Sequence, residues 1–341
     1  MAIYFTTLKR PARSSGPTKR SKINIGITFL PLLLLVGCES TPQKANIPVA
    51  PVAMVERADD EMIVAGQRFH TGTRIVTWQD NRGLNAYHFQ PSKLAGTENQ
   101  GVRRVATPDT DDSWIISNES WDLAHLQNHV DQFVLHYDSE GLSRRTFAIL
   151  QKRGLSSHFL LDVDGTIYQT LDLRDRAYHA TLANSRSIGI EIANIGAYPP
   201  GESQALNAWY EIDATGQIIA KPSPKSESGD VLTKDFIARP VRPDPVMGII
   251  NGQRVIQYDF TPEQYAALSK LTAALHQVFP LIKLDYPRDD KGRFLFKKLS
   301  DSGLENFQGV LGHFHIQENK VDPGPAFQWD RLIDSARLLG E

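Results

Sequence analysis

The chain has 341 residues, which is enough for one large domain or two modest ones, and its 41% apolar content argues against extensive disorder. Its formal charge of −2 is unevenly distributed, because residues 1–37 carry six Lys and Arg residues and no acidic residue. With +6 in that segment, the rest of the chain carries −8. A mildly acidic chain lacks the basic surface through which proteins bind nucleic acid, so we expect no nucleic-acid partner.

A secretory signal is predicted at the N-terminus, where the basic residues precede the apolar run INIGITFLPLLLLVGC, residues 23–38. This run is short for a membrane span. Its last four residues, LVGC, resemble the lipobox at which bacterial lipoproteins are cleaved and acylated on cysteine. Cys38 is the single cysteine of the chain, so a disulfide within the chain is excluded, and a buried thiol is the alternative to acylation.

We therefore expect a signal peptide over residues 1–37 and a lipid anchor at Cys38, since two acyl chains hold a protein on a membrane stably. By resemblance to Gram-negative sorting, Glu39 favours the outer membrane, with the protein facing the periplasm. Residues 38–62, rich in Pro, Ala and Ser, are typical of a flexible tether. A single folded domain is expected over residues 63–341, with a Pro-, Ser- and Lys-rich surface insertion at about 199–258 that includes a small hairpin around WYEIDATGQIIA.

Strand and helix signals alternate along the rest of the chain. Ser143 opens a helix that Gly154 ends, and Thr261-Pro262-Glu263-Gln264 carries the capping-box signature of a second helix. Strands are expected at QFVLHY (132–137), at SIGIEIANIG (187–196), and on both sides of Asp164-Gly165 in SHFLLDVDGTIYQTL (157–171). This alternation predicts an α/β fold with a mixed central β-sheet flanked by helices.

Two strand residues are candidates for chemistry. In QFVLHY, His136 shares a face with Val134, and as a lone histidine it is either a core residue or a ligand. In SIGIEIA, the isoleucines share one face while Glu191 shares the other with Gly189 and Ala193, which leaves a hollow beside the carboxylate. A buried carboxylate has a raised pKa, which suits a general base, although an edge strand would instead expose Glu191 to solvent.

The C-terminal stretch GHFHIQENKVDPGPAFQW, residues 312–329, combines ionisable side chains with a stiff backbone. The residue before a proline favours extended geometry, so Lys320 and Asp322 are expected to face one pocket. A catalytic zinc site uses three protein ligands and leaves a fourth position for water. His136, His313 and Asp322 meet this requirement, and we predict that they bind one Zn²⁺ per chain.

These segments resemble the zinc-dependent N-acetylmuramoyl-L-alanine amidase family, which includes the peptidoglycan-recognition proteins. The match lies in FVLHY, SSHFLLDVDGTIYQ followed by RAYHA, SIGIEIAN, and GHFHIQENKVDPGPAFQW. The resemblance implies that His136, His313 and Asp322 hold zinc, that Glu191 acts on the water, that Lys320 stabilises the oxyanion, and that His179 lies near the substrate cleft. It places His158 beside the central strands. Family members usually have one residue more before the Lys-Asp pair, so His315 is an alternative to His313 as ligand.

The implied reaction is hydrolysis of the amide between N-acetylmuramic acid and L-alanine, in peptidoglycan or in released muropeptides. Two other functions stay open at this point. The protein is a peptidoglycan-binding lipoprotein without catalysis if a ligand is missing, or a lipoprotein with a purely structural metal site if a fourth ligand closes it.

Overall fold

The central sheet of the described residues has six strands and is mixed, as the sequence predicts. Strands β12, β4, β7 and β5 run parallel, β6 pairs antiparallel with β5, and β3 runs parallel to β6. In spatial order, the strands are β12 (Gly309–Gly312), β4 (Gln132–Tyr137), β7 (Ser187–Ile192), β5 (Phe159–Leu161), β6 (Ile167–Gln169) and β3 (Ile75–Thr77). The hairpin predicted around Asp164-Gly165 is the β5–β6 pair.

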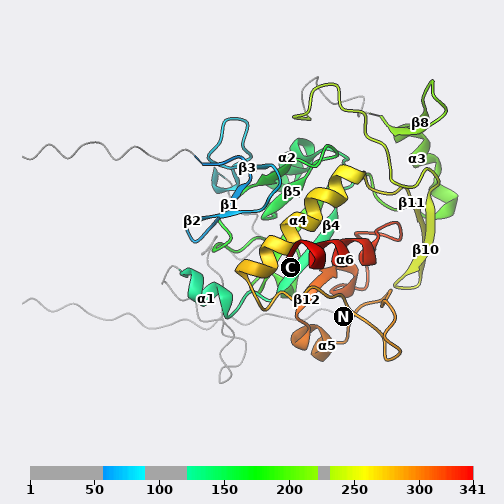
Figure 1. The fold of residues 1–341 in the computed structure, drawn as a ribbon. Helices are drawn as coiled ribbons and strands as arrows, with labels where there is room; N and C mark the ends of the chain where they lie inside the picture. The colour runs from blue at the N-terminus through cyan, green and yellow to red at the C-terminus, as the bar shows by residue number, and fades with distance from the viewer. Residues whose placement is uncertain (1–56, 89–120, 222–230, 341) are drawn as a thin grey trace, which may run out of the picture. The chain divides into compact units, whose positions relative to one another are not determined.

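The computed structural model describes residues 57–88, 121–221 and 231–340, which belong to one compact unit (Figure 1). The predicted signal peptide, Cys38 and most of the predicted tether lie outside the described residues. The first strand, β1 (Glu61–Val64), begins within the last residues assigned to that tether and pairs with β2 (Gln67–His70). None of the described helices combines the length and the apolar character that crossing a bilayer requires.

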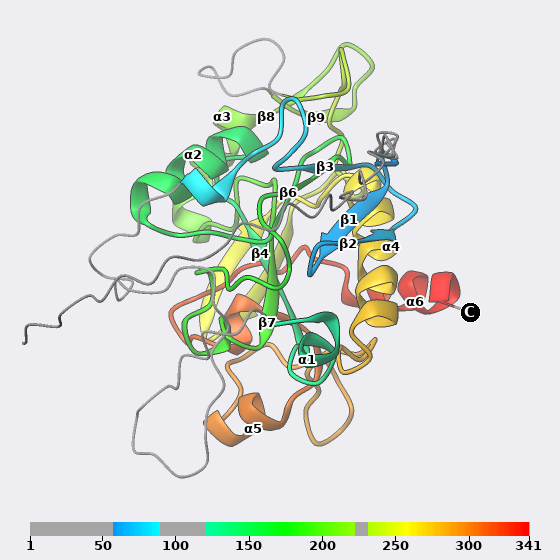
Figure 2. The ribbon, with the colours of Figure 1, turned by 90° about the vertical axis from the view of Figure 1, so that its left-hand side faces the viewer.

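Helices cover both faces of the sheet, as Figure 2 shows. Helices α4 (Pro262–Val278) and α6 (Trp329–Gly340) pack together on one face, where they share the main hydrophobic core with β4 and β7. Helix α2 (Ser143–Arg153) lies against the other face, where Leu150 packs with Leu160 and Tyr168. The predicted α/β architecture, a mixed sheet flanked by helices, is therefore confirmed.

Side chains alternate along β4 as its sequence predicts. Phe133 and Leu135 belong to the core beneath α4, whereas Val134 belongs to a smaller cluster on the opposite face. In β7, the three isoleucines likewise face the main core. His136 and Glu191 are register partners in the β4–β7 ladder, so both lie on the face away from α4.

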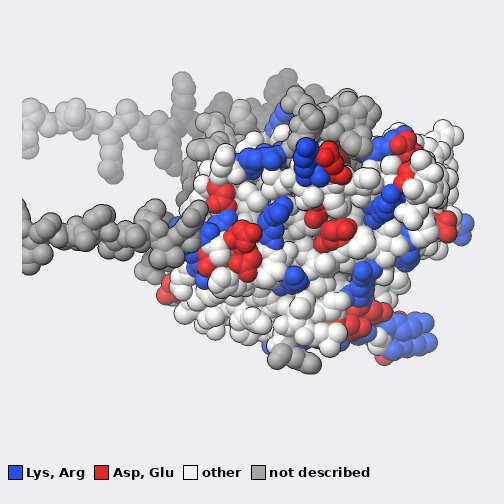
Figure 3. All heavy atoms as spheres, turned by 45° about the horizontal axis from the view of Figure 1, so that its top comes forward, with Lys and Arg blue, Asp and Glu red and all other residues white. Residues whose placement is uncertain are grey.

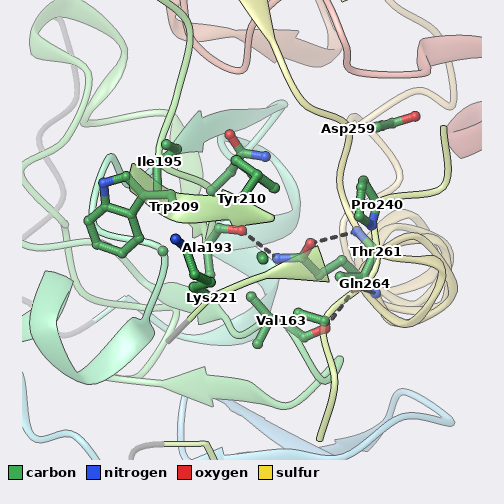
Figure 4. A pocket seen from close by; sticks show the side chains of 14 residues that line it. Val163, Ala193, Ile195, Trp209, Tyr210, Lys221, Pro240, Asp259, Thr261 and Gln264 are labelled. Carbon is green, nitrogen blue, oxygen red and sulfur yellow. Dashed lines mark hydrogen bonds between the residues drawn. The ribbon is translucent and has the colours of Figure 1, made fainter. Parts of the chain in front are cut away.

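The start of α4 is fixed by the predicted capping box, which Figure 4 shows at the rim of a pocket. The Thr261 hydroxyl accepts from the Gln264 amide N–H, and the Gln264 side chain accepts from the Thr261 N–H. The Gln264 side chain also donates to the carbonyl of Ala193, and the Thr261 hydroxyl donates to the carbonyl of Val163. The cap therefore ties α4 to the chain that follows β7, two residues beyond Glu191.

The described residues of the insertion at about 199–258 contain two hairpins. Strands β8 (Tyr210–Ile212) and β9 (Ile218–Ala220) form the predicted small hairpin, which follows α3 (Gln204–Trp209). Strands β10 (Val246–Ile250) and β11 (Gln253–Gln257) form a second hairpin. This second hairpin lies at the surface with one side packed on the domain, because Met247 and Ile249 are exposed whereas Ile250, Val255 and Gln257 are buried.

Short elements complete the described chain. They are η1 (Ala86–His88), α1 (Leu123–Gln127), η2 (Thr181–Ala183), η3 (Pro200–Glu202), α5 (Asp301–Asn306) and η4 (His313–His315).

On the face drawn in Figure 3, basic and acidic side chains are interspersed among uncharged ones.

Candidate metal centre

Three side chains distant in sequence converge at one end of the parallel strands. His136 lies near the end of β4, and His313 directly follows β12, the strand that pairs with β4. Asp322 lies in the turn that follows η4. The Nδ1 atoms of the two histidines are 3.0 Å apart, and Asp322 Oδ2 lies 2.9 Å from Nδ1 of His136 and 3.0 Å from Nδ1 of His313.

All three side chains are buried, with exposed fractions of 2% for His136, 6% for His313 and 8% for Asp322. Burial lowers the pKa of His136 to about 4, which favours the neutral imidazole. Burial alone would raise the pKa of Asp322, but the charge of His313 and the hydrogen bonds from both histidines hold it below its ordinary value. A neutral imidazole and an ionised carboxylate are the protonation states that a metal ion requires of its ligands.

The donor atoms are close enough to share one ion. Two atoms that each lie about 2.1 Å from zinc are separated by at most about 4.2 Å, and these three are separated by 2.9–3.0 Å. Among the described residues, this is the one group of three His, Cys, Asp or Glu side chains whose possible ligand atoms all lie within 4.8 Å of one another. Two imidazole nitrogens and one carboxylate oxygen are a donor set typical of catalytic zinc.

The outer ring nitrogens of both histidines are held by neighbouring side chains. His313 Nε2 lies 2.6 Å from Gln317 Oε1, so in the tautomer that donates from Nε2 to this oxygen the lone pair of Nδ1 would be available to an ion. His136 Nε2 lies 3.0 Å from His179 Nδ1. The sequence analysis did not identify Gln317 as a partner of His313. Its position four residues after His313 was the one sequence feature that could have indicated this contact.

His179 occupies the hollow that the sequence predicts beside Glu191. A Cβ atom on Gly189 would lie 2.5 Å from His179 Nδ1, so the ring fills the space that glycine leaves. The ring is partly exposed, and its Nε2 lies 3.2 Å from Ser187 Oγ. The expectation of an open hollow over Gly189 is therefore wrong, and His179 contacts His136 directly.

His158 and His315 have structural surroundings. His158 Nδ1 accepts from the Gly189 N–H, and its Nε2 donates to the carbonyl of Asp175, beside the central strands as expected. His315 Nδ1 accepts from the Gly312 N–H, and its Nε2 donates to the carbonyl of Leu295. Since both nitrogens of His315 are bonded and its side chain is fully buried, the geometry selects His313 over His315 as the candidate ligand.

Glu191 and Lys320 lie within electrostatic range of the cluster. Burial raises the pKa of Glu191 well above its ordinary value, and the negative charge of Asp322 raises it further, while Lys320 opposes the shift. The charge of Lys320 also acts on His136. The structure therefore brings His136, His313 and Asp322 together beside Glu191, and the positive charge of Lys320 acts on this group.

A family model supports the resemblance that the sequence suggests. Residues 126–221 match the model of N-acetylmuramoyl-L-alanine amidase, a segment that includes His136, His179 and Glu191 and ends before His313. A comparison with curated proteins gives no match.

Several solved structures are similar at low identity. The amidase AmiD from E. coli, in complex with anhydro-N-acetylmuramic acid-L-Ala-D-gamma-Glu-L-Lys, is 17% identical over 68% of this chain and 65% of its own, with a TM-score of 0.35. A selenomethionine derivative of AmpD is 18% identical over 71% of this chain and 95% of its own, with a TM-score of 0.30. The endolysin LysCS from Clostridium intestinale URNW is 14% identical over 63% and 88%, with a TM-score of 0.32.

The match to AmiD thus spans slightly less than two thirds of that protein. Over residues 126–221, the chain is similar to the N-acetylmuramoyl-L-alanine amidase family, and this segment supplies one of the three candidate metal ligands and the half-buried Glu191 beside them.

Proposed function

We propose that the protein is a zinc-dependent N-acetylmuramoyl-L-alanine amidase that cleaves the bond between N-acetylmuramic acid and L-alanine in peptidoglycan or muropeptides. One observation carries the proposal: two imidazoles and a carboxylate converge beside Glu191 in a chain whose central segment matches amidases. Zinc at this site would be held by His136, His313 and Asp322. When bound, zinc supplies a Lewis acid that polarises a carbonyl and makes water more acidic.

Glu191 has the protonation behaviour that amide hydrolysis needs. Its carboxylate accepts a proton from the attacking water, and its raised pKa makes it a stronger base than an exposed glutamate. As the carbon–nitrogen bond breaks, Glu191 returns the proton to the amine of L-alanine. The products are then a muramic acid carboxyl group and a peptide with a free amino terminus. The hydroxyl of the water molecule is in the carboxyl group, and its remaining proton is on the amine.

Lys320 and the outer hydrogen bonds complete the proposed site. The ammonium group of Lys320 stabilises the negative charge that develops on the scissile carbonyl oxygen, an effect typically worth a few kcal/mol. His179 and Gln317 hold the two imidazoles with the Nδ1 atoms directed toward Asp322. A ring held in this way loses little freedom when it binds an ion.

We also propose that Cys38 carries a lipid anchor that holds the enzyme on the outer membrane, facing the periplasm. The support is the basic and apolar N-terminal segment that ends in LVGC. Tethering would keep the enzyme next to its cell-wall substrate.

Replacing Glu191 by Gln is expected to lower the turnover of muropeptides at least about 100-fold, because the amide side chain cannot accept the proton. Zinc content is expected to stay at the wild-type level. Mass spectrometry of products from sacculi and from soluble muropeptides measures the turnover, and Glu202→Gln, an exposed position, is the matched control. Unchanged turnover in Glu191→Gln would remove Glu191 from the mechanism. If the zinc-loaded wild-type protein releases no peptide, the amidase proposal is wrong.

The choice between the two C-terminal histidines is tested by His313→Gln and His315→Gln. His313→Gln is expected to lose the zinc, whereas His315→Gln is expected to keep about one zinc per chain and to unfold at a lower temperature. Metal analysis of the folded fraction, together with thermal unfolding, separates these outcomes. Retention of zinc by His313→Gln and its loss by His315→Gln would contradict the assignment.

Cys38→Ser is expected to abolish incorporation of labelled palmitate and to move the protein from the membrane fraction to the soluble fraction. The palmitate label on the isolated protein measures acylation. Cell fractionation, with sucrose-gradient separation of inner and outer membranes, measures where the protein is located. Persistent membrane association of the unlabelled variant would argue against an acyl anchor at this position.

A further inference from the structure

The second hairpin of the insertion contacts the segment that carries Lys320 and Asp322. In Figure 1, β10 and β11 lie beside each other at the edge of the molecule, and α6 follows the contacted segment. Between η4 and α6, the segment 316–328 contains no helix or strand of its own. Some of its backbone groups bond locally, as the Lys320 N–H does to the carbonyl of Gln317, and others bond to side chains from elsewhere in the chain.

Asn251 at the tip of the hairpin supplies several of those partners. Its Nδ2 lies 3.0 Å from the carbonyl oxygen of Phe314, 3.3 Å from that of Gln317 and 3.0 Å from that of Lys320. Its Oδ1 accepts from the Lys298 N–H at 2.7 Å. Asn251 has a φ of +49°, and the following Gly252 has a φ of +76°. A two-residue hairpin turn with positive φ at both positions favours the sequence Asn-Gly.

Gln257, at the end of β11, holds the other side of Asp322. Its Nε2 donates to the carbonyl of Pro323 at 3.0 Å, and its Oε1 accepts from the Ala326 N–H at 3.1 Å. Gln257 Nε2 also lies 3.2 Å from Oδ1 of Asn194, which follows β7. A Cβ atom on Gly324 would lie 2.0 Å from Gln257 Oε1, so only glycine admits this approach.

Two further contacts extend the same junction. Arg242, which precedes β10, donates to the carbonyl of Ala326 and pairs with the buried carboxylate of Asp259. On β10, a Cβ atom at Gly248 would lie 2.5 Å from Cβ of Pro325, so the strand and the turn meet closely.

We infer that the β10–β11 hairpin is a positioning element for the metal centre, with Asn251 and Gln257 as its positioning residues. The two side chains bond to backbone on either side of Asp322, at Lys320 and at Pro323. They thereby fix the carboxylate within hydrogen-bond distance of both imidazoles before any ion binds. The inference rests on the metal site of the proposed function, and it gives the insertion a specific task.

Asn251→Asp and Asn251→Gly test this inference in the full-length protein. Asn251→Asp replaces a donor with an oxygen that faces three carbonyls, while aspartate tolerates the left-handed backbone as asparagine does. Asn251→Gly removes the side chain and also tolerates that backbone, so it decides the question if Asn251→Asp fails to fold. Arg254→Ala, an exposed position on the same hairpin, is the control.

Zinc affinity, measured by competition with a chromophoric chelator, is expected to fall roughly 10- to 100-fold in Asn251→Asp and less in Asn251→Gly, as for other residues that orient ligands. In metal-free protein, amide hydrogen exchange across 314–326 is expected to be faster in both variants and unchanged in Arg254→Ala. Zinc affinity and exchange equal to wild type in both variants would overturn the inference. If the wild-type protein binds no zinc, the proposed function fails, and hydrogen exchange alone still decides whether the hairpin holds the turn.

Discussion

The structure depends on the placement of one buried carboxylate between two buried imidazoles. Asp322 keeps its negative charge in a site from which water is largely excluded, and burial of an unpaired charge costs several kcal/mol. The two histidine Nδ1 atoms, within 3.0 Å of each other and of the carboxylate, are its compensating groups. Such a cluster favours a cation over an empty state, because a divalent ion satisfies all three groups at once. Because the arrangement is costly for stability alone, it is better suited to binding a metal ion than to stabilising the fold.

The sheet topology brings the cluster together. Because β12 lies beside β4 and β4 lies beside β7, the ends of three parallel strands place His313, His136 and Glu191 next to one another. Asp322 does not lie on the sheet, so its position depends on the turn after η4 and on the hairpin that packs against that turn. The candidate ligands therefore come from two sources: strand β4 and the residue directly after β12 supply the imidazoles, and a loop that contacts the insertion supplies the carboxylate. Loops positioned in this way by a scaffold often carry functional residues.

Local patterns in the sequence were sufficient for the sheet and for part of the site. Alternation in QFVLHY and SIGIEI identified the faces of β4 and β7, and the Thr261–Gln264 signature identified the start of α4. The choice between His313 and His315 required the structure, because only packing shows that both nitrogens of His315 bond to the backbone. The contacts of Gln257 and Asn251 with the chain around Asp322 were equally inaccessible, since those partners lie 60 or more residues away and leave no periodic pattern in the sequence. His179 was found from the family resemblance, but its contact with Gly189 and His136 depends on tertiary packing.

The identity of the ligands is tested most directly by zinc-edge X-ray absorption on the loaded protein, together with anomalous diffraction from its crystals. The predicted result is one zinc per chain, bonded to Nδ1 of His136 and of His313 at about 2.0–2.1 Å and to a carboxylate oxygen of Asp322 at about 2.0–2.2 Å, with no fourth protein side chain. A zinc ion bound without one of these three residues, or enclosed by four protein ligands, would contradict the assignment of a catalytic metal centre.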